Sequence, residues 1–318
     1  MGASTRACLF AACLAASLVA HADDEPALGG HKLSEFPAAG AAPVFKLERA
    51  GEEPRRALRY HLAAGSSHKL VMTLRMSVGV ELDGRGAPVQ RAPAMRMVFD
   101  CRVTEADDQK ARFEFGLAEP PELFETEGVP PAMLEAMKKS LTPLSSIRGH
   151  VAMTSRGVVT EARLEVGPGL EQGAEQMVQS MRQSIEQTSV PLPEDAVGVG
   201  AQWKMLQRVD GGGITVYQVT AFRLMRFEEQ VATLEVALEQ FAPRQEMAAP
   251  PNAGGAKAEL ASMHGNGAGH IAVDLGSPVP RSSAEFDTTL RMNIPVQDRT
   301  VEMGMRNRMQ VKVEPGTP

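Results

Sequence analysis

The stretch that decides the fold is LVMTLRMSVGVEL, residues 70–82. Its odd positions are mostly polar and include Arg75 and Glu81, whereas its even positions are all apolar: Leu70, Met72, Leu74, Met76, Val78, Val80 and Leu82. Successive strand residues point to opposite faces, so this alternation predicts a β-strand with one buried and one solvent-facing side. At about 3.3 Å per residue the strand would span roughly 43 Å, which is unusually long. Long strands with one polar face indicate a strongly twisted antiparallel sheet.

The same alternation recurs along the chain, at residues 97–103, 111–117 and 301–313, where Asn307 is the one polar exception in the apolar set. Two segments have helical spacing instead. One begins at Pro130-Pro131 and covers 131–141, and the other covers 170–188. Each is apolar on one side only, so we expect both to lie against the sheet. The predicted fold class is α+β: about eleven or twelve strands in a curved, long-stranded antiparallel sheet, half-barrel or barrel-like, covered by two or three helices.

A weak internal repeat indicates how the domain is organised. Residues 109–117 resemble 230–238, and residues 149–153 resemble 269–273, at nearly equal offsets. This favours duplication and predicts a single β-rich domain over 58–314, made of two related halves at about 58–168 and 169–314. Residues 23–57 are rich in Ala, Pro, Gly and charge, which predicts a flexible leader. Residues 243–267 are similarly rich in Ala, Gly and Pro and predict a flexible loop, with a short helix at 256–263.

The N-terminus has the pattern of a secretory signal peptide over residues 1–22. Arg6 provides the positive region, Ala7 to Ala20 is apolar, and small residues precede a cleavage site after Ala22. The alternative is lipid attachment at Cys13, but the apolar region before it would be unusually short. We therefore expect a periplasmic or extracellular protein. Removal of residues 1–22 leaves Cys101 as the one cysteine, so no internal disulfide is expected.

The composition excludes two classes of partner. Lys and Arg number 33 against 39 Asp and Glu, a net charge of -6, which argues against nucleic acid because phosphates need a basic surface. After the signal, no apolar run reaches the roughly 18 residues of a membrane-spanning helix, so no transmembrane span is expected.

Methionine is the most unusual residue, with 18 in the chain. Seven fall on the apolar sides of predicted strands: Met72, Met76, Met97, Met292, Met303, Met305 and Met309. Three interpretations remain open. Met can fill an irregular core, it can line a cavity for a lipid because its flexible side chain adapts to acyl chains, or its thioether can bind Cu(I). The amphipathic strand pattern already accounts for the Met303–Met309 spacing, so no metal or other cofactor is expected.

Motifs for catalysis are missing from the sequence. It contains no Gly-x-Ser-x-Gly, no His-Glu-x-x-His and no Cys-x-x-Cys, and residues 254–257 fail as a phosphate-binding loop. Cys101 lies among apolar strand residues, which predicts a buried, unreactive thiol. His150 and His270 occupy equivalent positions of the repeat, and we expect a structural role for both. The sequence therefore predicts a protein that is not an enzyme.

One short stretch carries a resemblance to a known group of proteins. LPEDAVGVGAQW, residues 192–203, resembles the Pro-rich approach to a Gly-x-x-Trp strand in a family of secreted bacterial proteins of unknown function. That resemblance implies long β-strands with a few helices and no known activity. The pattern of strands and helices is also similar to the half-barrel carriers of lipids and lipoproteins in the bacterial envelope. Trp203 is then a core anchor or a ligand contact at the mouth of the barrel.

The leading hypothesis is a non-catalytic secreted or envelope protein that binds a hydrophobic ligand, such as a lipid, in a Met-rich concave interior. The ligand-binding candidates are the seven methionines named above and Trp203. One alternative is a structural or interaction module at the cell surface that binds an envelope protein and no small ligand. A further alternative is a hydrolase with an unrecognised carboxylate site.

Overall fold

A computed structural model of the chain describes residues 27–28, 30–165, 190–211, 213–248, 257–296 and 299–316. Within these residues, 63% lie in strands and 7% in helices. The predicted antiparallel β-sheet is confirmed. The α+β fold with two or three covering helices is wrong, because one α-helix is present in the described residues and it does not cover the sheet.

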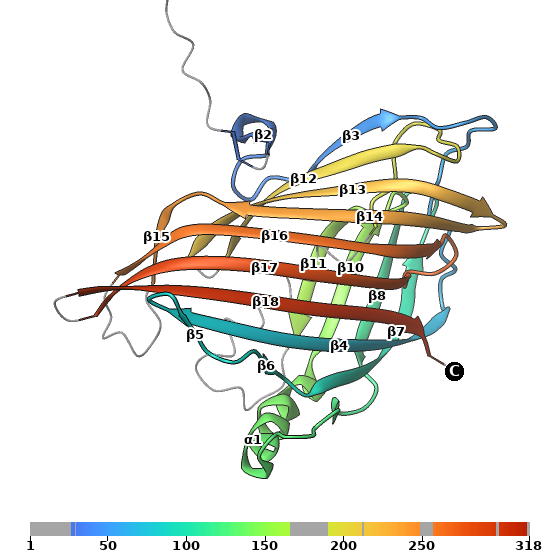
Figure 1. Cartoon of the computed structure of the whole chain (residues 1–318). Coiled ribbons are helices and arrows are strands. Elements are labelled where there is room, and N and C mark those ends of the chain that lie inside the picture. Colours follow the sequence, from blue (N-terminus) through green and yellow to red (C-terminus); the bar gives the residue numbers. More distant parts are fainter. Residues whose placement is uncertain are drawn as a thin grey trace, which may run out of the picture.

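The described strands form one large antiparallel sheet (Figure 1). Its principal strands follow one another in this order: β11 (Val159–Glu165), β10 (Arg148–Thr154), β8 (Lys110–Leu117), β7 (Ala94–Ala106), β4 (Ser67–Leu82), β18 (Arg299–Pro315), β17 (Arg281–Val296), β16 (Lys257–Asp274), β14 (Val231–Ala242), β13 (Ile214–Glu228), β12 (Gln202–Gly211) and β3 (Val44–Arg49). Four short strands pair beside this path: β5 (Arg85–Gly86), β6 (Gln90–Arg91), β9 (Glu122–Phe124) and β15 (Gln245–Ala248). Strands β1 (Ala27–Leu28) and β2 (His31–Lys32) pair separately.

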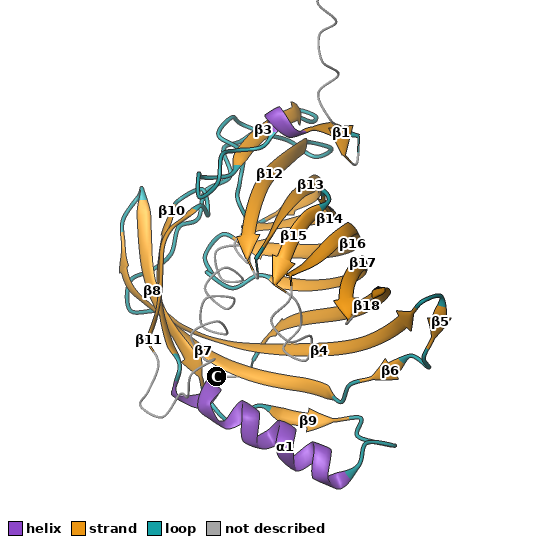
Figure 2. Ribbon diagram, turned by 90° about the vertical axis from the view of Figure 1, so that its left-hand side faces the viewer, coloured by secondary structure: helices purple, strands orange, loops and turns teal. Residues whose placement is uncertain are grey.

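The sheet is curled, as the view along its long strands shows (Figure 2). Its concave side can be identified from the packing. Met153 of β10 belongs to the same buried cluster as Trp203 of β12 and Leu234 of β14, and Phe113 of β8 packs against that cluster. These strands lie far apart in the order of the sheet, so their side chains meet only because the sheet folds over on itself. We call the face that carries them the concave face.

The connecting segments close this end of the concave face. Leu58 and Leu192 are fully buried in the cluster, and the Trp203 Nε1–H donates a hydrogen bond to the Pro191 carbonyl at 3.2 Å. Gly198 is packed so closely that a Cβ on it would lie 1.7 Å from the Glu52 carbonyl oxygen. No side chain fits there without movement of the backbone. The resemblance stretch at 192–203 thus contributes Leu192, Val197, Ala201 and Trp203 to the core, whereas residues 194–196 are exposed.

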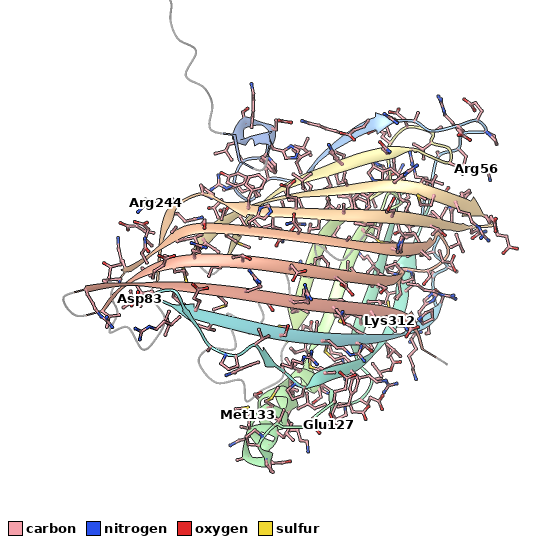
Figure 3. The ribbon with its side chains drawn as sticks, viewed as in Figure 1. Arg56, Asp83, Glu127, Met133, Arg244 and Lys312 are labelled. Atoms are coloured by element: carbon pink, nitrogen blue, oxygen red, sulfur yellow. The ribbon has the colours of Figure 1, made fainter. Side chains whose placement is uncertain are left out.

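The α-helix α1 (Pro131–Leu141) is where the sequence predicts it, but it has no buried residue. Met133 on it is 55% exposed, and the helix lies below the sheet, outside the concave side (Figures 2 and 3). Its apolar residues Leu134, Met137 and Leu141 are half-buried, and none is fully buried. Two short 3-10 helices complete the helical residues, η1 (Leu33–Glu35) and η2 (Thr142–Ser146). Phe36, which follows η1, packs on the convex face.

The sequence predicts two more helices besides α1. The helix expected at 170–188 lies outside the described residues. The short helix expected at 256–263 is wrong, because β16 begins at Lys257. Strand β16 and strand β15 thus occupy much of the range 243–267, for which the sequence predicts a loop, and β3 lies within the range 23–57.

The repeated segments pair in the same way. His150 of β10 lies opposite Glu114 of β8, and His270 of β16 lies opposite Glu235 of β14. Both pairs belong to one continuous sheet, so the described parts of the two sequence halves share it.

Candidate functional site

The concave face brings the seven candidate methionines together. Strand register places Met72 opposite Met97, Met76 opposite Met309, and Met292 opposite Met303. Met305 lies between Val80 and Leu290 in the next row. All seven side chains therefore line one face of four neighbouring strands, β7, β4, β18 and β17. This is the same face as that of Trp203, because a continuous row of paired residues joins the two regions: Phe222, Val236, Gly269, Ala284, Val311 and Leu74.

Trp203 does not lie beside the methionines. It is 2% exposed, stacks on Phe222 with ring centroids 5.5 Å apart, and belongs to the cluster that closes one end. The structure thus places it as a core anchor. A second buried cluster lies at the opposite end of the concave face and includes Met292, Leu260 and Ile294, with Met303 packed against it.

The methionine surface is partly open. Met76 is 36% exposed and Leu82 is 49% exposed, although both point to the concave side. They are joined on this face of β4 by the half-buried Val78 and Val80, and a contiguous apolar surface is typical of sites that bind something apolar. Met is suited to this use, because its unbranched thioether chain adapts to ligands of different shape.

The two faces of the sheet differ sharply in charge. Over the eight described strands from β7 to β12, the concave positions carry no Asp, Glu, Lys or Arg apart from Arg299 at the first residue of β18. The convex positions carry many, and they pair across strands, as Arg308 does with Asp287 at 2.9 Å. Lys312 lies near one end of the long strands, and Asp83 and Arg244 lie near the other (Figure 3).

Polar side chains on the concave face are concentrated in one row. Gln207, Gln218, Gln240, Gly265, Thr288 and Asn307 lie directly opposite one another on six adjacent strands, β12, β13, β14, β16, β17 and β18. We call this the amide row. The amide of Gln218 is buried, donates from Nε2 to Gln207 Oε1 at 3.1 Å, and accepts at Oε1 from Gln240 Nε2 at 2.7 Å.

The far end of the amide row is unsatisfied. The Oδ1 atom of Asn307 is buried and has no hydrogen-bond partner among the described residues. Sequence analysis missed the row because isolated glutamines look like solvent-facing strand residues. The available signal was Asn307, the polar exception in the apolar set of residues 301–313.

A second candidate lies on the convex face over β4, β7, β8, β10 and β11. It is a pocket of about 700 Å³ in which His150 lies between Glu114, at 3.5 Å from Nδ1, and Glu165, at 3.4 Å from Nε2. Cys101 also lines it, but burial raises the pKa of this thiol to about 12, so it stays protonated and is a poor nucleophile. Within the described residues, no group of three or more His, Cys, Asp or Glu side chains is arranged to hold a metal ion.

No helix in the described part of the chain is both long and apolar enough to cross a membrane. The chain matches no protein-family model and no curated protein. Among solved structures, it is similar to Ail, the attachment invasion locus protein of Yersinia pestis, at 10% identity and a TM-score of 0.17, over 79% of this chain and 100% of that one.

Two further solved structures are similar at the same level. An outer membrane channel from Pseudomonas putida F1 matches at 8% identity and a TM-score of 0.21, over 80% of this chain and 98% of that one. OmpF of Salmonella typhi, in a complex with daunomycin, matches at 7% identity and a TM-score of 0.22, over 78% and 98%. These TM-scores are too low to support a statement about the fold or function of this chain.

Proposed function

We propose that this is a non-catalytic protein of the bacterial envelope that binds a hydrophobic ligand on its concave face. The observation that carries the proposal is the uncharged, Met-rich surface of four neighbouring strands, part of which is open to solvent at Met76 and Leu82. The location in the periplasm or outside the cell rests on the signal sequence at residues 1–22.

The physical argument is the cost of leaving this surface in water. Each Å² of apolar surface that a ligand removes from water contributes about 25 cal/mol, so a long acyl chain would gain several kcal/mol on this face. The charged convex face supplies solubility. Over the eight strands from β7 to β12, the concave face offers an acyl chain no charge to desolvate except Arg299 at the start of β18. Arg85 of the short strand β5 lies beside that surface, opposite Leu82.

The test is native mass spectrometry of residues 23–318, exported to a periplasm and purified without detergent. We expect a bound mass in the lipid range that is lost on organic extraction and regained with lipid extract. A protein that stays free of ligand under all these conditions would instead support the alternative of an interaction module.

A matched pair of variants locates the site. Met76→Glu places a carboxylate on the concave face and should abolish lipid binding, because an unpaired charge must be desolvated there. Ser77→Glu places the same charge on the convex face of the same strand, opposite Arg308 and Arg91, and should leave binding intact. Equal binding by the two variants would remove the concave face from the proposal.

A further inference from the structure

The amide row divides the concave face and gives the ligand a polar contact point. Burying an amide among apolar side chains costs free energy unless its hydrogen bonds are made. Gln207, Gln218 and Gln240 meet that requirement by bonding to one another. The remaining members of the row, Thr288 and Asn307, lie beyond a glycine that interrupts the chain of amides.

Gly265 allows two side-chain oxygens to lie close to the strand backbone. A Cβ at this position would be crowded, at 3.1 Å from Thr288 Oγ1 and 3.4 Å from Gln240 Oε1. Gln240 uses its Nε2 donor on Gln218. Its oxygen is therefore turned toward Gly265. The buried Asn307 Oδ1 follows in the next position of the row.

The Gln240 and Asn307 amide oxygens are acceptors, the Thr288 hydroxyl can donate as well as accept, and no cationic side chain adjoins them in the row. A carboxylate or phosphate would lose its water shell with no positive charge to replace it, which is costly. A pure hydrocarbon would leave the acceptor oxygens buried without partners, which is also costly. A neutral group that donates hydrogen bonds meets both conditions.

We propose that the ligand is a neutral amphiphile whose hydroxyl or amide group donates a hydrogen bond to Asn307 Oδ1 and accepts one from the neighbouring Thr288 hydroxyl. Its hydrocarbon chain lies along the adjoining methionines, first Met309 and Met76 in the neighbouring row. This inference rests on the proposed function, since it names the class of ligand for the same face.

Three probes with the same acyl chain test the inference: monopalmitoylglycerol, which donates hydrogen bonds, methyl palmitate, which does not, and palmitate, which is anionic at pH 8. Affinities are measured by titration of the extracted protein, with native mass spectrometry as the readout. We expect monopalmitoylglycerol to bind about tenfold more tightly than either of the others, the value of one net hydrogen bond. Asn307→Leu should remove that advantage, because the acceptor that distinguishes the probes is then gone.

Thr288→Val removes the hydroxyl next to Asn307 and gives a second test of the preference, which remains available if Asn307→Leu does not fold. Thr289→Val, on the convex face of the same strand, is its matched control and should keep the preference. Equal affinity for the three probes, a preference for palmitate, or variants that keep the wild-type preference would overturn the inference while the proposed function stands. Binding of none of the probes and of no lipid extract would count against the proposed function itself.

Discussion

Replacement of Asn307 by leucine should stabilise the ligand-free protein. The Asn307 Oδ1 atom is buried without a hydrogen-bond partner among the described residues, and its neighbours across the strands are Thr288 and Val78. Leucine has the same number and branching of side-chain heavy atoms as asparagine, and no polar atom. The substitution therefore removes an unsatisfied acceptor and adds an apolar side chain to an apolar face.

The expected increase in the free energy of unfolding follows from the cost of an unsatisfied buried acceptor, which is about 1–3 kcal/mol. The Asn307 side chain as a whole is half-buried, so the lower part of that range, about 1–2 kcal/mol, is expected. For a chain of this size the Tm should rise by about 2–6 °C.

The assay is thermal unfolding of the extracted protein, followed by circular dichroism, with the absence of ligand checked by mass spectrometry. Asn266→Leu is the control, because Asn266 is exposed on the convex face and bonds to His264 at 3.0 Å. Asn266→Leu should not raise the Tm. A Tm for Asn307→Leu equal to or below that of the wild type would mean that Oδ1 is already satisfied, and the reasoning about the amide row would fail.

Three other predictions concern the rest of the molecule. Gly198→Ala should destabilise the protein by about 3 kcal/mol or more because its Cβ meets backbone, whereas Gly79→Ala, with 3.5 Å of space, should change stability by less than about 1 kcal/mol in thermal unfolding. Cys101 should react with iodoacetamide at pH 8 only in denaturant, because its pKa is raised to about 12; rapid labelling of the folded protein would contradict its burial. Hydrogen bonds from Arg75 lower the pKa of Glu125, so this carboxylate stabilises the folded state above the unfolded pKa of about 4.3 and loses that effect as the pH falls. Glu125→Gln should thus lower the Tm slightly at pH 7 and by less as the pH falls toward 3, and a difference that is independent of pH would refute the ionic explanation.

Much of the sheet could be predicted from alternation alone. The pattern in residues 70–82 became strand β4 with its even side chains on the concave face, and the methionines share that face because each strand keeps its own parity. The sequence could not predict which surface helix α1 packs against. Helical spacing identifies an amphipathic helix, but it does not say whether its apolar side finds a partner, and α1 buries none of its residues.

The glycine-rich part of β16 shows why a composition rule fails in this sheet. Glycine usually indicates a loop, yet Gly267 is in a strand because a Cβ there would lie 2.4 Å from the Phe286 ring of the neighbouring strand. Glycine at this position makes room for an aromatic ring on the concave side. A bulge between Leu260 and Ser262 also changes which residues face inward, so the simple alternation is lost along the sequence.

The amide row is hidden from the sequence for a related reason. Its members lie between Gln207 and Asn307 in the sequence, and each polar member taken alone resembles a solvent-exposed strand residue. Only the register of six strands places them side by side, and the register of β16 with β14 and β17 turns Gly265 inward. A polar row that depends on cross-strand register at every step, and that ends in an acceptor with no partner, is not explained by the stability of the sheet. The ligand proposed above, by completing the hydrogen bonds of this row, would account for the position of the row and for its free-energy cost.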